Sequence, residues 1–198
     1  MVASRYGAVV VSSEPESRPW VVHGRRPLYQ SEWISLTLVD VELPSGERFE
    51  HHAVLLPPAA MTVVLDDAGA RVLLSWRHRF VPDVWNWELP GGLLDESEEP
   101  VDTAAREVLE ETGYRVRNIE HLVTFEPMIG MVRNAHHVFL ARGVELVADP
   151  TELNEGTFQW LPLSDVPELI RTGKIVNSGS LVGLLHLLAL GGASSSDK

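Results

Sequence analysis

The chain has 198 residues, 44% of them hydrophobic and 22% charged, which suits one globular domain with its own core. A formal net charge of −12 argues against a broad nucleic-acid-binding surface, because such a surface must attract phosphates. The absence of cysteine excludes disulfides, thiolate metal sites and a cysteine nucleophile. We find no signal peptide and no apolar run long enough to span a bilayer, so we expect a cytoplasmic protein that does not bind membranes.

Strand patterns dominate the N-terminal part, residues 18–58. Residues 33–41 alternate between apolar and polar side chains, and residues 49–56 return after a turn, which predicts an N-terminal β-hairpin. We interpret the basic residues at 24–27 as a surface spot that can also meet a phosphate. Residues 1–17 before them are expected to form a flexible arm.

The main domain is expected to span residues 59–190, followed by a flexible tail over 191–198. Its first two strands, residues 60–65 and 71–76, are joined by a tight turn at 66–69. Mixed strands and helices predict an α/β fold in which a sheet packs between helices. Strand patterns recur at residues 85–90, 115–125, 137–141 and 158–161, and helices are expected to be capped by Ser164 or Asp165 and by Ser178 or Ser180.

Three groups that can carry positive charge, Arg77, His78 and Arg79, follow the second of these strands. They form either a solvated loop or a set of contacts to substrate phosphates or to carboxylates. Trp85 and Trp87 belong to the next short strand. We interpret both tryptophans as packing residues, with base stacking as the alternative.

Residues 91–114 carry the densest pattern in the chain. Gly91 and Gly92 make an open turn where the backbone can approach a ligand closely. A helix is predicted to begin at Pro100, because the missing N–H of proline is not needed in a first helical turn. The same helix is predicted to end at Gly113, a common left-handed stop.

The predicted helix groups its acids on one face. Glu107, Glu110 and Glu111 stand at positions i, i+3 and i+4, where like charges repel. A divalent cation would remove this repulsion, and carboxylate oxygens favour Mg²⁺ or Mn²⁺ over zinc. A solvated acidic helix is the alternative. Another face is expected to pack on a sheet and consists of Val101, Ala105, Val108, Leu109 and Thr112.

The complete spacing of these residues resembles the Nudix box. Gly92 is followed by five residues and Glu98, and then by seven residues and the run from Arg106 to Tyr114, which matches every fixed position of that motif. The chain therefore resembles the Nudix hydrolases, and the absence of cysteine disfavours their isopentenyl-diphosphate isomerase branch. Residues that look like the ADP-ribose pyrophosphatase branch lie at 43–46, 77–79, 87–92 and 160–166.

This resemblance implies an α/β/α sandwich with a mixed sheet, preceded by the N-terminal hairpin. In the ADP-ribose branch that hairpin often exchanges with a second subunit, so a homodimer is implied. The resemblance also implies a Mg²⁺- or Mn²⁺-dependent pyrophosphohydrolase. Such an enzyme cleaves the diphosphate of a nucleoside diphosphate linked to a group X, here ADP-ribose or a nucleotide sugar, and releases nucleoside monophosphate and phosphorylated X.

Roles for individual residues follow from the same resemblance. Arg106 is expected to orient a box carboxylate, and Glu98 to pair with Arg106 or to reach metal through water. The general base is either Glu107 or a neighbouring box glutamate, or else Glu152 or Glu155 of the acidic loop. The metal would be held by the Gly91 carbonyl, Glu107, Glu110 and Glu111, and the substrate contacted by Arg77, Arg79, Glu88 and Gly92.

Two other functions remain open. One is a nucleoside-triphosphate or dinucleotide pyrophosphatase, and the other is a non-catalytic Nudix domain that senses a nucleotide. The complete set of box acids argues against the sensor, because a domain that only binds does not need every catalytic carboxylate. Pro127 comes earlier after the box than the corresponding proline of the ADP-ribose branch, which leaves the exact substrate open.

Overall fold

The computed structural model describes residues 18–152 and 156–191. The predicted N-terminal arm, nearly all of the predicted tail and the candidate base Glu155 lie outside these ranges. No helix in the described part of the chain combines the length and the apolar character that crossing a membrane requires.

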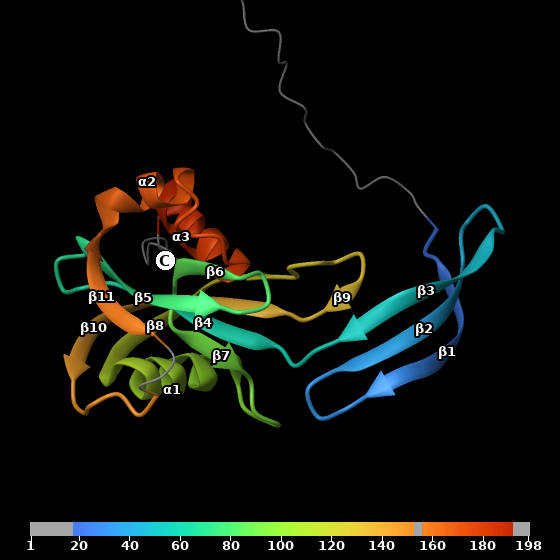
Figure 1. Cartoon of the computed structure of the whole chain (residues 1–198), viewed down its shortest axis with the longest axis horizontal. Helices are drawn as coiled ribbons and strands as arrows, with labels where there is room; N and C mark the ends of the chain where they lie inside the picture. Colours follow the sequence, from blue (N-terminus) through green and yellow to red (C-terminus); the bar gives the residue numbers. More distant parts are fainter. Residues whose placement is uncertain (1–17, 153–155, 192–198) are drawn as a thin grey trace, which may run out of the picture.

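The N-terminal part forms an antiparallel sheet that projects from one side of the body (Figure 1). Strands β2 (Ser35–Glu42) and β3 (Arg48–Leu55) are the predicted hairpin, which is confirmed. An additional strand, β1 (Val21–Gln30), pairs with β2 and contains the predicted basic spot. The sequence did not indicate β1, because Gly24 and Pro27 interrupt its pattern. Both are tolerated on an edge strand whose register shifts beside them.

The central sheet of the body is mixed, as predicted, with the order β7-β4-β10-β8. All six residues of β4 are buried, and this strand runs parallel to β10 and antiparallel to β7. β10 in turn pairs antiparallel with β8 over most of its length. The bounds are β4 (Ala59–Val64), β7 (Gly91–Leu93), β8 (Tyr114–Phe125) and β10 (His136–Leu146).

A second sheet of the body has the order β11-β5-β6, formed by β5 (Arg71–Arg79), β6 (Val84–Glu88) and β11 (Thr157–Pro162). The predicted turn before β5 is confirmed, since the Gly69 N–H donates to the Asp66 carbonyl at 2.8 Å. Beyond the Leu65–Val72 bridge, however, β4 and β5 enter different sheets instead of continuing as one hairpin. Arg77 and Arg79 belong to β5 and do not follow it.

Helices cover the central sheet on both sides, which confirms the α/β/α sandwich (Figure 1). On one side lies α1 (Pro100–Thr112), and on the other lie α2 (Val166–Arg171) and α3 (Ser178–Leu190). Asn177 caps α3 by accepting a hydrogen bond from the Ser180 N–H at 3.0 Å, so the predicted caps Ser178 and Ser180 are wrong. Asp165, one of the two residues predicted for the preceding helix, occupies the N-cap position of α2. The core between α3 and the sheets includes Val63, Leu74, Val138, Leu140 and Leu184, each contributing about 1.5–3 kcal/mol by burial.

A short strand, β9 (Val132–Arg133), ties the N-terminal sheet to the body. It pairs in parallel with the end of β3. The preceding loop accepts a further hydrogen bond, from His51 Nε2 to the Gly130 carbonyl at 2.9 Å. The base of the projecting sheet is therefore held by backbone contacts to the body.

Candidate active site

Helix α1 brings the predicted box residues to the edge of the central sheet. Gly113 ends the helix as predicted, with a φ of 74° and an N–H that donates to the Leu109 carbonyl at 2.8 Å. The buried face differs in part from the prediction, because Glu107 and Glu111 are buried whereas Val101 is 37% exposed. Two acids thus lie inside the fold instead of on a solvated surface, and the alternative of a solvated acidic helix is wrong.

The two glycines of β7 make room for backbone and carboxylate. A Cβ atom at Gly91 would collide with the Ala60 carbonyl and with Met61 on the neighbouring strand β4. A Cβ atom at Gly92 would collide with the Glu107 carboxylate. Glycine at these positions lets β7 lie close to β4 and lets Glu107 lie against β7.

Three carboxylates converge beside these glycines. Glu107, Glu111 and Glu152 each offer an oxygen atom within 4.8 Å of the others. Glu107 and Glu111 are 8% and 3% exposed, whereas Glu152 is exposed on the acidic loop. Burial raises the pKa of Glu107, and it raises the pKa of Glu111 to about 7, in both cases assisted by the neighbouring carboxylates.

Glu111 is positioned by two donors. The Gly91 N–H donates to Glu111 Oε2 at 2.9 Å, and Arg77 donates to Oε1 at 3.3 Å. Arg77 is only 9% exposed, so the solvated-loop interpretation is wrong for this residue. The structure records a contact of the Gly91 amide with a box acid, and the predicted metal contact of its carbonyl stays a prediction.

Arg106 holds the remaining box acids. Its guanidinium donates to Glu98 at 3.0 Å and to Glu107 and Glu110 at 2.9 Å each. Glu98 also accepts a hydrogen bond from Thr103 Oγ1 at 2.7 Å, and together with Arg106 this contact lowers the pKa of Glu98 to about 2. The predicted Arg106–Glu98 pair is therefore present. Glu110 lies outside the convergent cluster and contacts Arg106.

Another ion pair, between Arg79 and Glu88, lines the same cleft. Arg79 donates to both oxygens of Glu88, at 2.9 Å and 2.6 Å. Glu88 is 3% exposed, and Asn86 Nδ2 donates to its Oε1 at 3.0 Å. All four predicted substrate-contacting residues line one cleft of about 590 Å³ together with the convergent carboxylates, namely Arg77, Arg79, Glu88 and Gly92.

The convergent carboxylates fit a divalent metal ion. Only oxygen donors are present, as hard cations prefer, and two of the three carboxylates are buried. Arg77 and Arg106 each contact one of these carboxylates, and a bound cation would reduce the repulsion that remains between the three. Glu107, Glu111 and Glu152 are the residues that could hold such an ion.

Several residues of the cleft were not predicted as site residues. Trp33 reaches it from the turn between β1 and β2 and is 63% exposed. Asn177, the cap of α3, borders both this cleft and the neighbouring cavity that contains Asn86. A polar residue between two tryptophans was a usable signal for Asn86, whereas the position of Asn177 depends on a tertiary contact that local patterns do not encode.

Comparisons with known proteins agree with this geometry. The family model described as NUDIX domain matches residues 55–178. A CMP-5′-(N-acetyl-N-hydroxy-3-aminopropyl)phosphonate hydrolase from Streptomyces rubellomurinus is 51% identical over 88% of this chain and 84% of its own length. An ADP-ribose pyrophosphatase from Mycobacterium tuberculosis is 32% identical over 76% and 74% of the two chains. A solved structure of an ADP compounds hydrolase is 14% identical, covers 88% of this chain and 95% of its own, and superimposes with a TM-score of 0.75, which shows the shared fold.

Proposed function

The chain belongs to the Nudix family, and from this premise we propose that it cleaves the P–O–P linkage of a nucleoside 5′-phosphate joined to a group X, with the help of a divalent cation. It is a Nudix hydrolase of the ADP-ribose pyrophosphatase type that acts on nucleoside diphosphate derivatives. The observation that carries the proposal is the convergence of Glu107, Glu111 and Glu152 in a cleft that Arg77, Arg79 and Arg106 border.

The chain's own residues supply binding and positioning. Glu107 and Glu111 would hold the metal beside the exposed Glu152, and Arg77 and Arg79 add positive charge that attracts an anionic substrate to the cleft. When bound, Mg²⁺ or Mn²⁺ neutralises phosphate charge and acidifies water. In the reaction, water adds to one phosphorus atom and the bridging P–O bond breaks, which yields nucleoside monophosphate and X with its own phosphoryl or phosphonyl group.

The position of Glu152 supports the acidic loop as the source of the general base. This side chain is exposed and close to the two buried acids, so it can reach a water molecule in the cleft. Glu107 is less suited, because its carboxylate accepts a hydrogen bond from Arg106. Glu155 lies outside the described residues and stays a candidate from the sequence.

We propose a phosphonate-bearing cytidine nucleotide as the first candidate substrate. The 51% identity to the Streptomyces CMP-phosphonate hydrolase, over most of both chains, favours it. ADP-ribose, the substrate predicted from the sequence, is the second candidate, supported by pyrophosphatases that are 27% and 32% identical. Both are nucleoside monophosphates joined to a second phosphorus group, so one cleavage chemistry serves either.

A substrate panel tests this function. The protein is incubated with a CMP-linked phosphonate, ADP-ribose, a nucleotide sugar and a nucleoside triphosphate, each with Mg²⁺, with Mn²⁺ and with a chelator, and the products are identified by mass. We expect metal-dependent release of nucleoside monophosphate, fastest from the CMP-linked phosphonate. Release from none of the four compounds, or equal release in chelator, contradicts the proposal.

The base assignment has its own test. Glu152→Gln should lower turnover by about 100-fold with little change in melting temperature, because this side chain is exposed. Glu145→Gln is the matched control, since Glu145 is exposed on β10 and pairs with Arg117 at 2.7 Å. Equal activities of the two variants would assign the base elsewhere, to Glu107 or to Glu155.

We also propose that the protein is a homodimer assembled through its N-terminal sheet. This projecting sheet exposes large apolar side chains, a composition typical of protein–protein interfaces. Analytical ultracentrifugation should give twice the chain mass, and Tyr29→Glu should shift the protein towards monomer. A wild-type protein that sediments as a monomer at all concentrations contradicts this assembly. The exposed large apolar side chains on β1 and on the residues that flank it are Trp20, Val21, Val22, Leu28, Tyr29 and Trp33.

A further inference from the structure

A cavity of about 610 Å³ lies at the base of the projecting N-terminal sheet. One face of that sheet and the loop that leads into β9 border it. β9 pairs with β3 at this base, where the projecting sheet meets the body (Figure 1). Among the residues that the structure describes, none lines both this cavity and the carboxylate cleft. The cavity is therefore a separate space from the cleft of the proposed reaction.

Strand register places three basic side chains on the cavity face of this sheet. Arg25 on β1 and His51 on β3 both pair with Val39 of β2, and directly paired residues point to the same face. Arg133 on β9 pairs with Leu55, which is an even number of residues along β3 from His51, so it shares that face. All three basic residues line the cavity.

The two faces of the sheet differ in how their arginines are compensated. Arg26 points to the face opposite Arg25 and donates to Glu50 at 3.2 Å. Within residues 18–152 and 156–191, the side chains of Arg25 and Arg133 make no hydrogen bond and no ion pair. No described aspartate or glutamate lines the cavity either, although the chain has a net charge of −12. Positive charge therefore faces this cavity without a carboxylate beside it.

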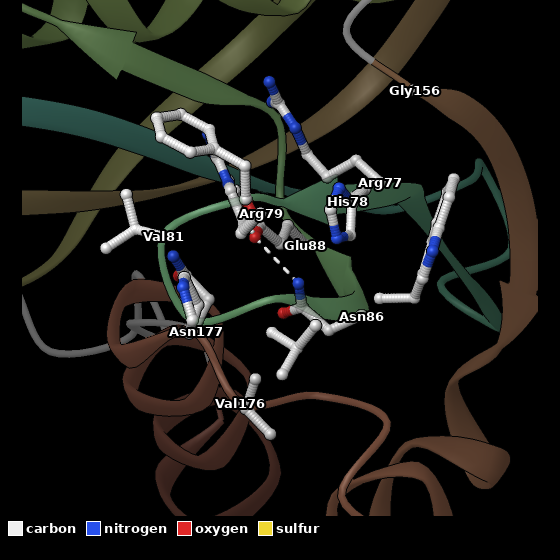
Figure 2. A pocket seen from close by; sticks show the side chains of 13 residues that line it. Arg77, His78, Arg79, Val81, Asn86, Glu88, Gly156, Val176 and Asn177 are labelled. Carbon is white, nitrogen blue, oxygen red and sulfur yellow. Dashed lines mark hydrogen bonds and ion pairs between the residues drawn. The ribbon is translucent and has the colours of Figure 1, made fainter.

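Arginines in the neighbourhood of the carboxylate cleft are in a different situation. Arg77 and Arg79 line the cavity of about 950 Å³ shown in Figure 2, where they contact Glu111 and Glu88 respectively. Part of the charge of each guanidinium is thus compensated within the chain. In the cavity at the base of the sheet, an anion would be the first partner of both guanidinium groups.

The loop over this cavity supplies an apolar wall. His51 Nε2 donates to the Gly130 carbonyl at 2.9 Å, so His51 holds the loop and leaves the arginines to meet a ligand. Ile129 and Met131 of the same loop line the cavity and are 86% and 48% exposed. Such side chains can contact the organic part of a ligand whose charged part lies at the arginines.

From these observations we infer that this cavity is a second ligand site, which binds an organic phosphate through Arg25 and Arg133. The two arginines are on the outer strands of the sheet, about 14 Å apart at about 4.8 Å per strand. A ligand that meets both must span this width, which favours an organic diphosphate over a single phosphate ion. Ser35 lines the same face and adds a hydroxyl group. The inference goes beyond the proposed function, because the site uses neither the convergent carboxylates nor a metal ion.

Calorimetry in the presence of a chelator tests this site. The full chain is titrated with CDP and with cytidine, the matched ligand that lacks phosphate. Without metal the carboxylate cleft repels an anion, so binding of CDP reports on the second site. We expect CDP to bind at least about 10-fold more tightly than cytidine, because guanidinium–phosphate contacts are charge-assisted. Equal affinities, or no binding of CDP, overturn the inference.

Variants of neighbouring arginines locate the bound anion. Arg25→Ala and Arg133→Ala should each weaken CDP binding about 10-fold or more, because each removes a charge-assisted hydrogen bond. Arg26→Ala is the matched control, since it removes the same charge from the opposite face of the same strand and should bind CDP as the wild type does. All three side chains are exposed, so the variants should fold. Equal CDP affinities of Arg25→Ala and Arg26→Ala overturn the inference.

Sedimentation separates a ligand site from a contact with a second copy, since Arg25 belongs to the sheet that we propose as the dimer interface. If Arg25 pairs with acids of a second copy instead, Arg25→Ala shifts the protein towards monomer and binds CDP as the wild type does, which overturns the inference. The proposed function fails separately, because hydrolysis needs metal and this binding is measured without it. Loss of hydrolysis in the substrate panel would leave the second site standing.

Discussion

Two groups of acids on and around α1 differ in how their negative charge is compensated. Glu98 and Glu110 are bonded to Arg106, and the pKa of Glu98 falls to about 2 because of that contact. Glu111 lies deeper and converges with Glu107 and Glu152, and burial raises its pKa to about 7. The first group is compensated by Arg106, whereas the second group brings three carboxylates together with single arginine contacts, from Arg106 to Glu107 and from Arg77 to Glu111.

The difference separates a structural role from a functional one. Glu110 and Glu111 are neighbours in the sequence, yet they contact different partners, because consecutive helical residues lie about 100° apart. Each buried carboxylate costs stability, and Arg106 divides its charge between Glu107 and two further acids, so the arginines compensate the convergent carboxylates only in part. The convergent group therefore indicates an external cation, and the Arg106 group holds the helix and the loop before it in place.

Glu111→Gln is the change with the largest expected effect. The amide keeps an oxygen for the Gly91 N–H but loses the charge that a metal ion needs, so turnover should fall about 1000-fold or more. Steady-state rates with Mg²⁺ on the best substrate of the panel measure this loss. The melting temperature without metal should be maintained or raised, because a buried charge is removed. Undiminished turnover would remove Glu111 from the metal assignment.

The effect of added metal on the free energy of unfolding should show whether the convergent acids bind the cation. Mg²⁺ or Mn²⁺ at about 100 times its dissociation constant should stabilise the wild-type protein by about 2.7 kcal/mol, since it binds the folded state. Thermal unfolding with metal and with chelator measures this difference. Glu111→Gln should abolish most of the metal-dependent shift, whereas the control Glu145→Gln should preserve it. A shift of equal size in Glu111→Gln would mean that the cation binds elsewhere.

Arg106→Ala tests the group that has its own counter-charge. Removing this guanidinium leaves Glu98, Glu107 and Glu110 without their common donor, and the fold should lose about 2–3 kcal/mol. Urea unfolding without metal measures the loss. Arg142→Ala is the control, because its pair with Glu120 is exposed on both sides and contributes at most about 1 kcal/mol. Equal losses in the two variants would refute a structural role for Arg106.

Local patterns in the sequence were sufficient to predict the helix of the Nudix box, α1. Pro100 and Gly113 fix its ends through backbone geometry that depends on single residues, and both ends are confirmed. The spacing also grouped Glu107 and Glu111 correctly. It did not separate Glu110 from them, because the choice depends on where Arg106 lies, and that is set by contacts to Glu98 and the preceding loop.

Features that depend on contacts between distant positions could not be predicted from the sequence patterns. Glu152 comes near α1 because the Thr151 N–H donates to the Glu110 carbonyl at 2.8 Å, a contact that links positions far apart in the chain. The separation of β4 from β5 into two sheets likewise depends on the pairing of β4 with β10. Periodicity predicts that a strand exists, but its partner is selected by the whole fold.

Glu110→Gln has the smallest expected effect. It is also the most direct test of whether the two groups of acids have different roles. The sequence analysis named both Glu110 and Glu111 as metal ligands, and on that basis this change and Glu111→Gln would both lower turnover by orders of magnitude. The geometry instead predicts a loss of about 10-fold, or about 1.4 kcal/mol, because the Glu110 carboxylate contacts Arg106 and not the convergent cluster. Rates of both variants in the same Mg²⁺ buffer decide between the two expectations. Equal losses would mean that Glu110 leaves Arg106 when metal and substrate bind, and the two groups of acids would then act as one.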